Sequence, residues 1–159
     1  MKLDFSIAIT TAILSALWII VATLLNLPSW AGFLGCTTFF AFNDNRVKAL
    51  FTCAFSLASG ATWACMSLAI INLSKGSLCI LFIATGAMAI LRCIQARLKY
   101  VSFIPGAFIG SCTIFSNTEH IFESLIALFI GLFSGFLMNY SGIYLHRMTT
   151  SEHPPAWCT

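Results

Sequence analysis

Two short apolar stretches of the sequence carry matching glycines and hydroxyl side chains. A glycine in an apolar helix leaves room beside the backbone, and a hydroxyl group both donates and accepts hydrogen bonds. Groups of this kind, without a fixed charge, suit the passage of a small neutral or weakly polar solute. The solute pathway predicted from the sequence consists of Gly35, Thr37, Thr38, Gly110, Ser111 and Thr113.

Ionisable side chains, which a proton pump or an enzyme needs, are scarce in the apolar stretches. Asp44, Glu119 and Glu123 fall in polar connectors. Arg92 lies at the end of an apolar stretch, where a basic side chain usually anchors the helix by reaching toward the interface. The sequence shows no HExxH, GxSxG or phosphate-loop pattern. We therefore expect that the protein is not an enzyme.

The sulfur-containing residues predict no metal site. The seven cysteines form no CxxC pair, and thiols within apolar stretches usually behave as small apolar groups. Copper carriage by Cys36, Cys112, Met66 and Met138 is chemically possible because soft ligands select Cu(I). No CxxC or MxxxM spacing supports it, so we expect no metal and no cofactor.

The elements that position these groups are membrane helices. Of the 159 residues, 59% are hydrophobic and 8% are charged, whereas soluble domains carry about 25% charged residues. The mean hydropathy of +0.93 implies that the lipid bilayer covers much of the surface. A net charge of +3 is explained by anchoring at the cytoplasmic face, so no nucleic-acid partner is expected.

Six apolar stretches predict an all-α integral membrane protein, with residues 1–159 as a single membrane domain. The second and fifth stretches hold only about 15 residues, or roughly 22 Å of helix, against a hydrocarbon core of about 30 Å. They are therefore either short crossings or re-entrant hairpins. The stretches are 5–25, 29–43, 48–73, 77–96, 103–118 and 121–145.

The distribution of basic residues selects six crossings. Lysine and arginine in short loops accumulate on the cytoplasmic side. With six crossings and a cytoplasmic N-terminus, seven of the eight fall inside and only Lys75 falls outside. If both short stretches returned to the side they entered, four of the seven would move outside. We therefore expect a multi-pass protein with both termini cytoplasmic, including a tail at 148–159.

The sequence also repeats internally. GFLGCTTFF from Gly32 matches AFIGSCTIF from Ala107, an offset of 75 residues, and the ungapped match continues to the pair Gly60 and Gly135. Each unit holds three helices, so the halves enter the membrane in opposite directions as an inverted repeat. Paired short helices in such repeats often mark a solute site. The two repeats cover about 3–73 and 77–147.

Small residues spaced four apart line the two longest stretches. Such strips let helices approach closely in lipid, either within one chain or between subunits. Because a bundle of this size leaves much helix surface uncovered, we also expect a homo-oligomer. The predicted helix-packing residues are Ser56, Ser59, Gly60, Gly131, Ser134 and Gly135.

The six-segment pattern and the block LPSWAGFLGCTTFF at 27–40 resemble the YcdZ-like group of small bacterial inner-membrane proteins. The resemblance covers nearly the whole chain. It implies a location in the bacterial inner (plasma) membrane. The group carries no assigned activity, so no substrate and no functional residue is carried over.

Two functions follow from these patterns. The first is a channel or facilitated transporter for a small neutral or weakly polar solute, with its site between the paired short helices. The alternative is a non-transporting scaffold or accessory subunit that binds partner helices, and a membrane enzyme is a weaker third class. A polar-lined cavity between the second and fifth helices would favour transport, whereas a packed apolar centre would favour the alternative.

Overall fold

The apolar stretches form α-helices in the computed structural model, which describes residues 3–42, 47–73, 78–98 and 100–149. This confirms the predicted all-helical fold and its six segments. In lipid, a helix satisfies its own backbone hydrogen bonds, so apolar runs of this length fold as helices. Lys2, Arg46, Lys75, Lys99 and the tail from residue 150 lie outside the described residues. The helices are α1 (Leu3–Leu24), α2 (Ser29–Phe42), α3 (Val47–Leu73), α4 (Leu78–Gln95), α5 (Ile104–Ser116) and α6 (Ile121–Thr149).

Local signals at the start of each short helix set its length. Pro28 precedes α2, and Asn26 just before it adopts a left-handed conformation with φ of 51°, which asparagine tolerates better than most residues. Pro105 lies in the first turn of α5, where its missing N–H group costs nothing. With 14 and 13 residues, α2 and α5 are each about 20 Å long.

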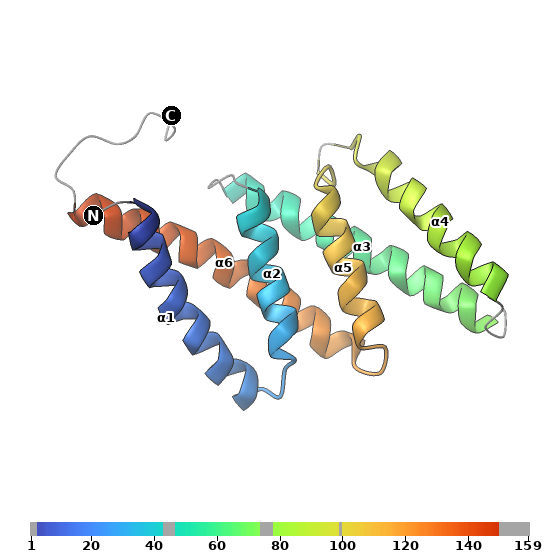
Figure 1. The fold of residues 1–159 in the computed structure, drawn as a ribbon, viewed down its shortest axis with the longest axis horizontal. Helices are drawn as coiled ribbons and strands as arrows, with labels where there is room; N and C mark the ends of the chain where they lie inside the picture. The colour runs from blue at the N-terminus through green and yellow to red at the C-terminus, as the bar shows by residue number, and fades with distance from the viewer. Residues whose placement is uncertain (1–2, 43–46, 74–77, 99, 150–159) are drawn as a thin grey trace.

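Each short helix packs against the long helix of the opposite half. The first half comprises α1 to α3 and the second comprises α4 to α6. Helix α2 lies against α6 and α5 lies against α3, while α1 covers α6 and α4 flanks α3 (Figure 1). Successive helices run in opposite directions across the bundle. Neither half, therefore, buries its own short helix.

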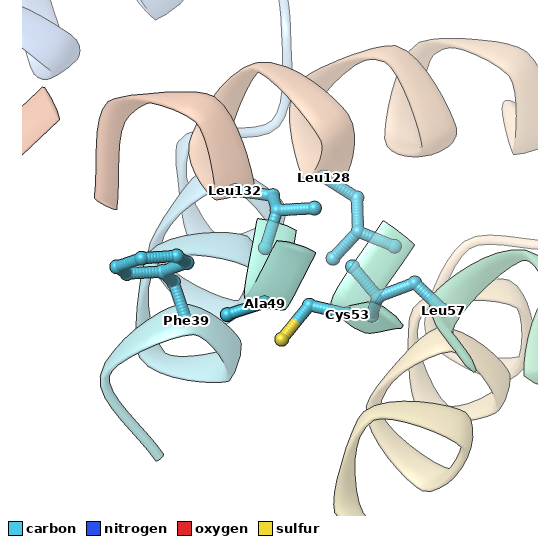
Figure 2. Close-up of a cluster of buried hydrophobic side chains, with 6 residues drawn as sticks. All are labelled: Phe39, Ala49, Cys53, Leu57, Leu128 and Leu132. Carbon is cyan, nitrogen blue, oxygen red and sulfur yellow. The ribbon is translucent and has the colours of Figure 1, made fainter. Parts of the chain in front are cut away.

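A cluster of buried apolar side chains occupies the centre of the bundle (Figure 2). Its members come from α2, α3 and α6, and each large side chain is at most 2% exposed. In a membrane, apolar burial alone gives helices no advantage over lipid, so close packing and dispersion hold this centre together. The large members are Phe39, Cys53, Leu57, Leu128 and Leu132.

Helix α1 is attached to the bundle at two points. The Trp18 ring lies directly on Gly32, where an added Cβ would collide with it, and its Nε1 donates to the Ser29 carbonyl at 3.0 Å. Nearer the start of α1, the Thr10 hydroxyl donates to the Met138 carbonyl of α6 at 3.1 Å. These bonds across helices fix the position of α1 beside α2 and α6.

The outer surface is apolar. Leu73, Phe82 and Phe122 are each more than 80% exposed, as expected for side chains that face lipid. Three helices are long and apolar enough to cross a bilayer, over Phe5–Leu24, Val47–Leu73 and Ile121–His146. The other three helices are shorter and also apolar. This surface fits an integral membrane protein.

Candidate functional site

Gly35 and Gly110, the paired glycines of the predicted pathway, lie where two helices touch backbone to backbone. A Cβ at Gly35 would collide with the Leu128 carbonyl on α6 and would lie 2.6 Å from the Leu132 nitrogen. At Gly110 it would collide with the Leu57 carbonyl on α3. A neighbouring helix therefore fills the space beside each glycine.

The glycines of the long helices complete these contacts from the other side. A Cβ at Gly131 would collide with the backbone of Gly32 on α2, and one at Gly60 with the backbone of Ala107 on α5. Small residues on both surfaces let the helix axes approach closely. The α2–α6 and α5–α3 contacts are thus alike. In each, the short helix of one half packs against the long helix of the other half.

The remaining packing residues have different surroundings. A Cβ at Gly135 would lie 3.0 Å from the Cα of Cys36 on α2, and Ser56 is fully buried in α3. Ser59 faces α4, whereas Ser134 donates to a carbonyl of its own helix at 3.0 Å. The glycines of the strips are therefore used within one chain.

The hydroxyl groups of the predicted pathway are bonded to helix carbonyls. Thr38 and Thr113 are fully buried, and each donates to the carbonyl four residues earlier, at 2.8 and 2.9 Å. Thr37 makes the same bond at 2.8 Å on the exposed face of α2. Ser111 donates to the Gly60 carbonyl at 2.7 Å and so fastens α5 to α3. Each of these hydroxyl groups already donates its proton to a backbone carbonyl and is not free to donate to a solute.

The five buried residues of the predicted pathway are divided between α2 and α5, with Gly35 and Gly110 each in a separate helix contact, and Thr37 lies on the exposed face of α2. Between α2 and α5 lies the apolar cluster of Figure 2, and Ile109 of α5 packs against it. Such surroundings offer a passing solute no hydrogen-bond partners. This is the packed apolar centre that favours the non-transporting alternative.

A polar bridge that the sequence analysis missed joins α3 to α4. The Gln95 side-chain oxygen accepts a hydrogen bond from Trp63 Nε1 at 2.7 Å, and its nitrogen donates to the Ser59 hydroxyl at 2.8 Å. Gln95 is the only glutamine of the chain, which was the available signal. Interhelical side-chain bonds of this kind hold membrane helices together.

Arg92 is buried between helices, one turn before Gln95. Only 7% of its surface is exposed, and Nε lacks a hydrogen-bond partner. The guanidinium carbon lies 5.1 Å from the centre of the Phe108 ring on α5. An anchoring arginine extends toward the interface, so this placement differs from the anchor expected from the sequence.

The loop acids and the sulfur residues form no cluster that could hold a metal ion among the described residues. His120 and Glu123 form an exposed pair at 3.1 Å, and nowhere in the described ranges do three His, Cys, Asp or Glu side chains gather. Cys36 lies 3.4 Å from the sulfur of Met138, while Cys112 is exposed on α5. A thiol beside a thioether is ordinary packing.

Comparisons with known proteins confirm the resemblance noted in the sequence. Residues 8–143 match the family described as "Protein of unknown function (DUF1097)". The chain is 42% identical over 145 residues to "Inner membrane protein YcdZ" of Escherichia coli (strain K12), covering 91% of this chain and 89% of that protein. It is 41% identical to the protein of that name from Salmonella typhimurium (strain LT2), covering 91% of each. No solved structure matches. The chain belongs to the DUF1097 family of membrane proteins, together with the inner membrane proteins YcdZ.

Proposed function

We infer that the chain crosses the inner membrane six times, as two inverted three-helix halves with both termini in the cytoplasm. Figure 1 shows the start of α3 and the end of α4 at one end of the bundle and the start of α6 at the other. Exposed Lys48 lies in the first turn of α3 and exposed Arg97 follows α4, whereas Glu119 precedes α6 and Glu123 lies in its first turn. This separation agrees with the positive-inside rule. The equivalent α2–α6 and α5–α3 contacts support the inverted relation.

Within this topology, we propose a non-transporting accessory or scaffold subunit whose lipid-facing helices bind a partner helix. The observation that carries this proposal is the packed centre between α2 and α5. Gly35 and Gly110 are closed by backbone, and the hydroxyl groups of Thr38 and Thr113 are bonded within their own helices. The residues with the best chemistry for a solute instead hold the two halves together.

Facilitated transport of a small neutral solute is the second candidate, and the interleaved halves favour it. Inverted repeats with paired short helices are a common transporter architecture. Transport through the centre would require the halves to separate along α2–α6 and α5–α3. Each cycle would then break the close backbone contacts at Gly35 and Gly110.

Reconstitution separates these two functions. Proteoliposomes carrying the wild-type chain or the Thr38→Val, Thr113→Val double variant are compared with empty vesicles for uptake of urea, ammonia, glycerol and short carboxylic acids. We expect the flux of empty vesicles in both cases, with equal amounts of folded protein. If the wild type shows a higher flux than empty vesicles and the double variant changes that flux, the protein is a transporter and the scaffold proposal is wrong.

Photo-cross-linking in native membranes tests the partner itself. Phe82 on α4 and Phe122 on α6 are both 83% exposed, so a cross-linking residue at either position is a matched control for the other. We expect a discrete product from position 82, because α4 is the helix least covered by the rest of the bundle. A product of twice the chain mass would identify a second copy. Lipid adducts alone at both positions would contradict the proposal.

A further inference from the structure

Arg92 is a buried cation whose neighbours leave its charge unbalanced. Its Nε is enclosed without a hydrogen-bond partner, although 7% of the residue remains exposed. Phe108 attracts the guanidinium group through its ring face, at 5.1 Å, but a ring carries no oxygen to accept the in-plane N–H groups. The buried Nε–H group therefore lacks an acceptor, while a small part of the residue remains exposed.

The guanidinium group points into the bundle. Arg92 occupies the last turn of α4, and Phe108 lies in the second turn of α5. An ionised side chain at such a depth is costly in lipid and is usually paired or functional.

The described part of the chain supplies no counter-ion for Arg92. Glu119 and Glu123 follow the far end of α5, and Glu123 already pairs with His120 at 3.1 Å. The neighbouring Gln95 amide is bonded on both sides to α3. Within the described ranges the Arg92 Nε–H group is thus left for a bound molecule to complete.

We propose that Arg92 binds a phosphate group, supplied by an anionic phospholipid of the leaflet at this end of the bundle. A guanidinium fork matches phosphate oxygens with two parallel hydrogen bonds. The start of α3, which carries the exposed Lys48, lies at the same end of the bundle as the end of α4 (Figure 1), and its charge attracts anionic lipids to this surface. Phe108, which lies against the guanidinium group, is 40% exposed, so apolar surface is present for an acyl chain.

The test uses the full chain in nanodiscs of three kinds: phosphatidylcholine alone, phosphatidylcholine with phosphatidylglycerol, and phosphatidylcholine with inorganic phosphate in the buffer. Thermal unfolding is followed for the wild type, Arg92→Met, Arg92→Lys and the exposed control Arg97→Gln. Native mass spectrometry measures the phosphatidylglycerol that remains bound after detergent extraction.

We expect phosphatidylglycerol to raise the unfolding temperature of the wild type and of Arg97→Gln, but not that of Arg92→Met. Phosphatidylcholine also carries a phosphate, but its choline balances the charge, so in phosphatidylcholine alone Arg92→Met should unfold close to the wild type. Retained phosphatidylglycerol should fall roughly tenfold in Arg92→Met, as expected for a lost charged hydrogen bond.

The comparison also distinguishes the source of the phosphate group. A rise with inorganic phosphate alone would keep the site and assign it to a soluble ligand. If Arg92→Met does not fold, Arg92→Lys decides, because a single ammonium group should keep only part of the gain. An equal gain in every folded Arg92 variant, or no gain in the wild type in either arm, would overturn the proposal.

Discussion

Replacing Gly35 by alanine probes the contact that joins the two halves. The added Cβ would collide with the Leu128 carbonyl and would lie 2.6 Å from the Leu132 nitrogen, where ordinary van der Waals contact begins at 3.4 Å. Both partners are backbone atoms of α6, so no side chain can rotate away. The nitrogen alone requires α2 and α6 to move apart by about 0.8 Å, and the closer carbonyl oxygen requires more.

The cost of this separation follows from the dispersion energy. A gap of about 0.5–1 Å forfeits roughly a quarter to a half of each contact's attraction. Overpacking of a close contact typically costs about 1–3 kcal/mol. We expect Gly35→Ala to lower the free energy of unfolding by this amount, and Gly110→Ala to do so similarly, because its Cβ would meet the Leu57 carbonyl on α3.

Gly86 provides the matched control. It lies in α4 with no atom within 4 Å of an added Cβ, so Gly86→Ala should be neutral or should stabilise by up to about 1 kcal/mol through helix propensity. Unfolding is followed in one detergent by circular dichroism for all three variants. If Gly35→Ala and Gly86→Ala unfold at the same point, the backbone contact is not as close as described and the reasoning fails.

Three further predictions concern the polar bridge, the topology and the assembly. Gln95→Leu leaves Trp63 Nε1 without its acceptor and Ser59 with only its bond to the Ser56 carbonyl, so it should cost about 1–3 kcal/mol of stability. In a double-mutant cycle with Trp63→Phe, simple additivity would contradict the bridge. Reporter fusions at Thr159 and Lys75 should report opposite sides of the membrane, and the same side would exclude six crossings. Native mass measurement in mild detergent should show a homo-oligomer, which a monomer at several concentrations would disprove.

The helices and their lengths were readable from the sequence because lipid imposes simple demands on a chain. Every backbone group must be satisfied locally, so apolar runs become helices and Pro28 and Pro105 mark their interruptions. The partner of each small-residue strip was not readable. A strip shows that some helix comes close, but the same residues serve contacts within a chain and between chains.

The repeat shows how sequence identity can mislead by one helical turn. Sequence alignment pairs Gly60 with Gly135. In the structure, Gly60 of α3 contacts the backbone of Ala107 on α5, and Gly131 of α6 contacts the backbone of Gly32 on α2. Because Gly32 and Ala107 are paired by the alignment, the residue equivalent to Gly60 in these contacts is Gly131. When small residues recur every four positions, two such strips align nearly as well after one is shifted by four residues against the other. Identity alone cannot resolve such a shift.

Arg92 and Gln95 show a second limit of sequence patterns. Both lie at the end of α4, and a basic or amide side chain at a helix end normally reaches water. Whether it turns inward depends on the faces that neighbouring helices present. Here Phe108 on α5 and Trp63 on α3 receive these side chains, and single-helix periodicity carries no information about such a meeting.

The interleaving of the halves has a consequence for biosynthesis. Gly35 reaches its partner Leu128 only after about 90 further residues have been made, which at about 5–20 residues per second takes roughly 5–20 s. During that interval α2, a short helix with glycines on one face, lies in the bilayer without α6, its main packing partner. The nascent chain must therefore accommodate α2 in lipid until α6 enters, and a chain that ends before α6 would leave α1 and α2 without their main packing partner.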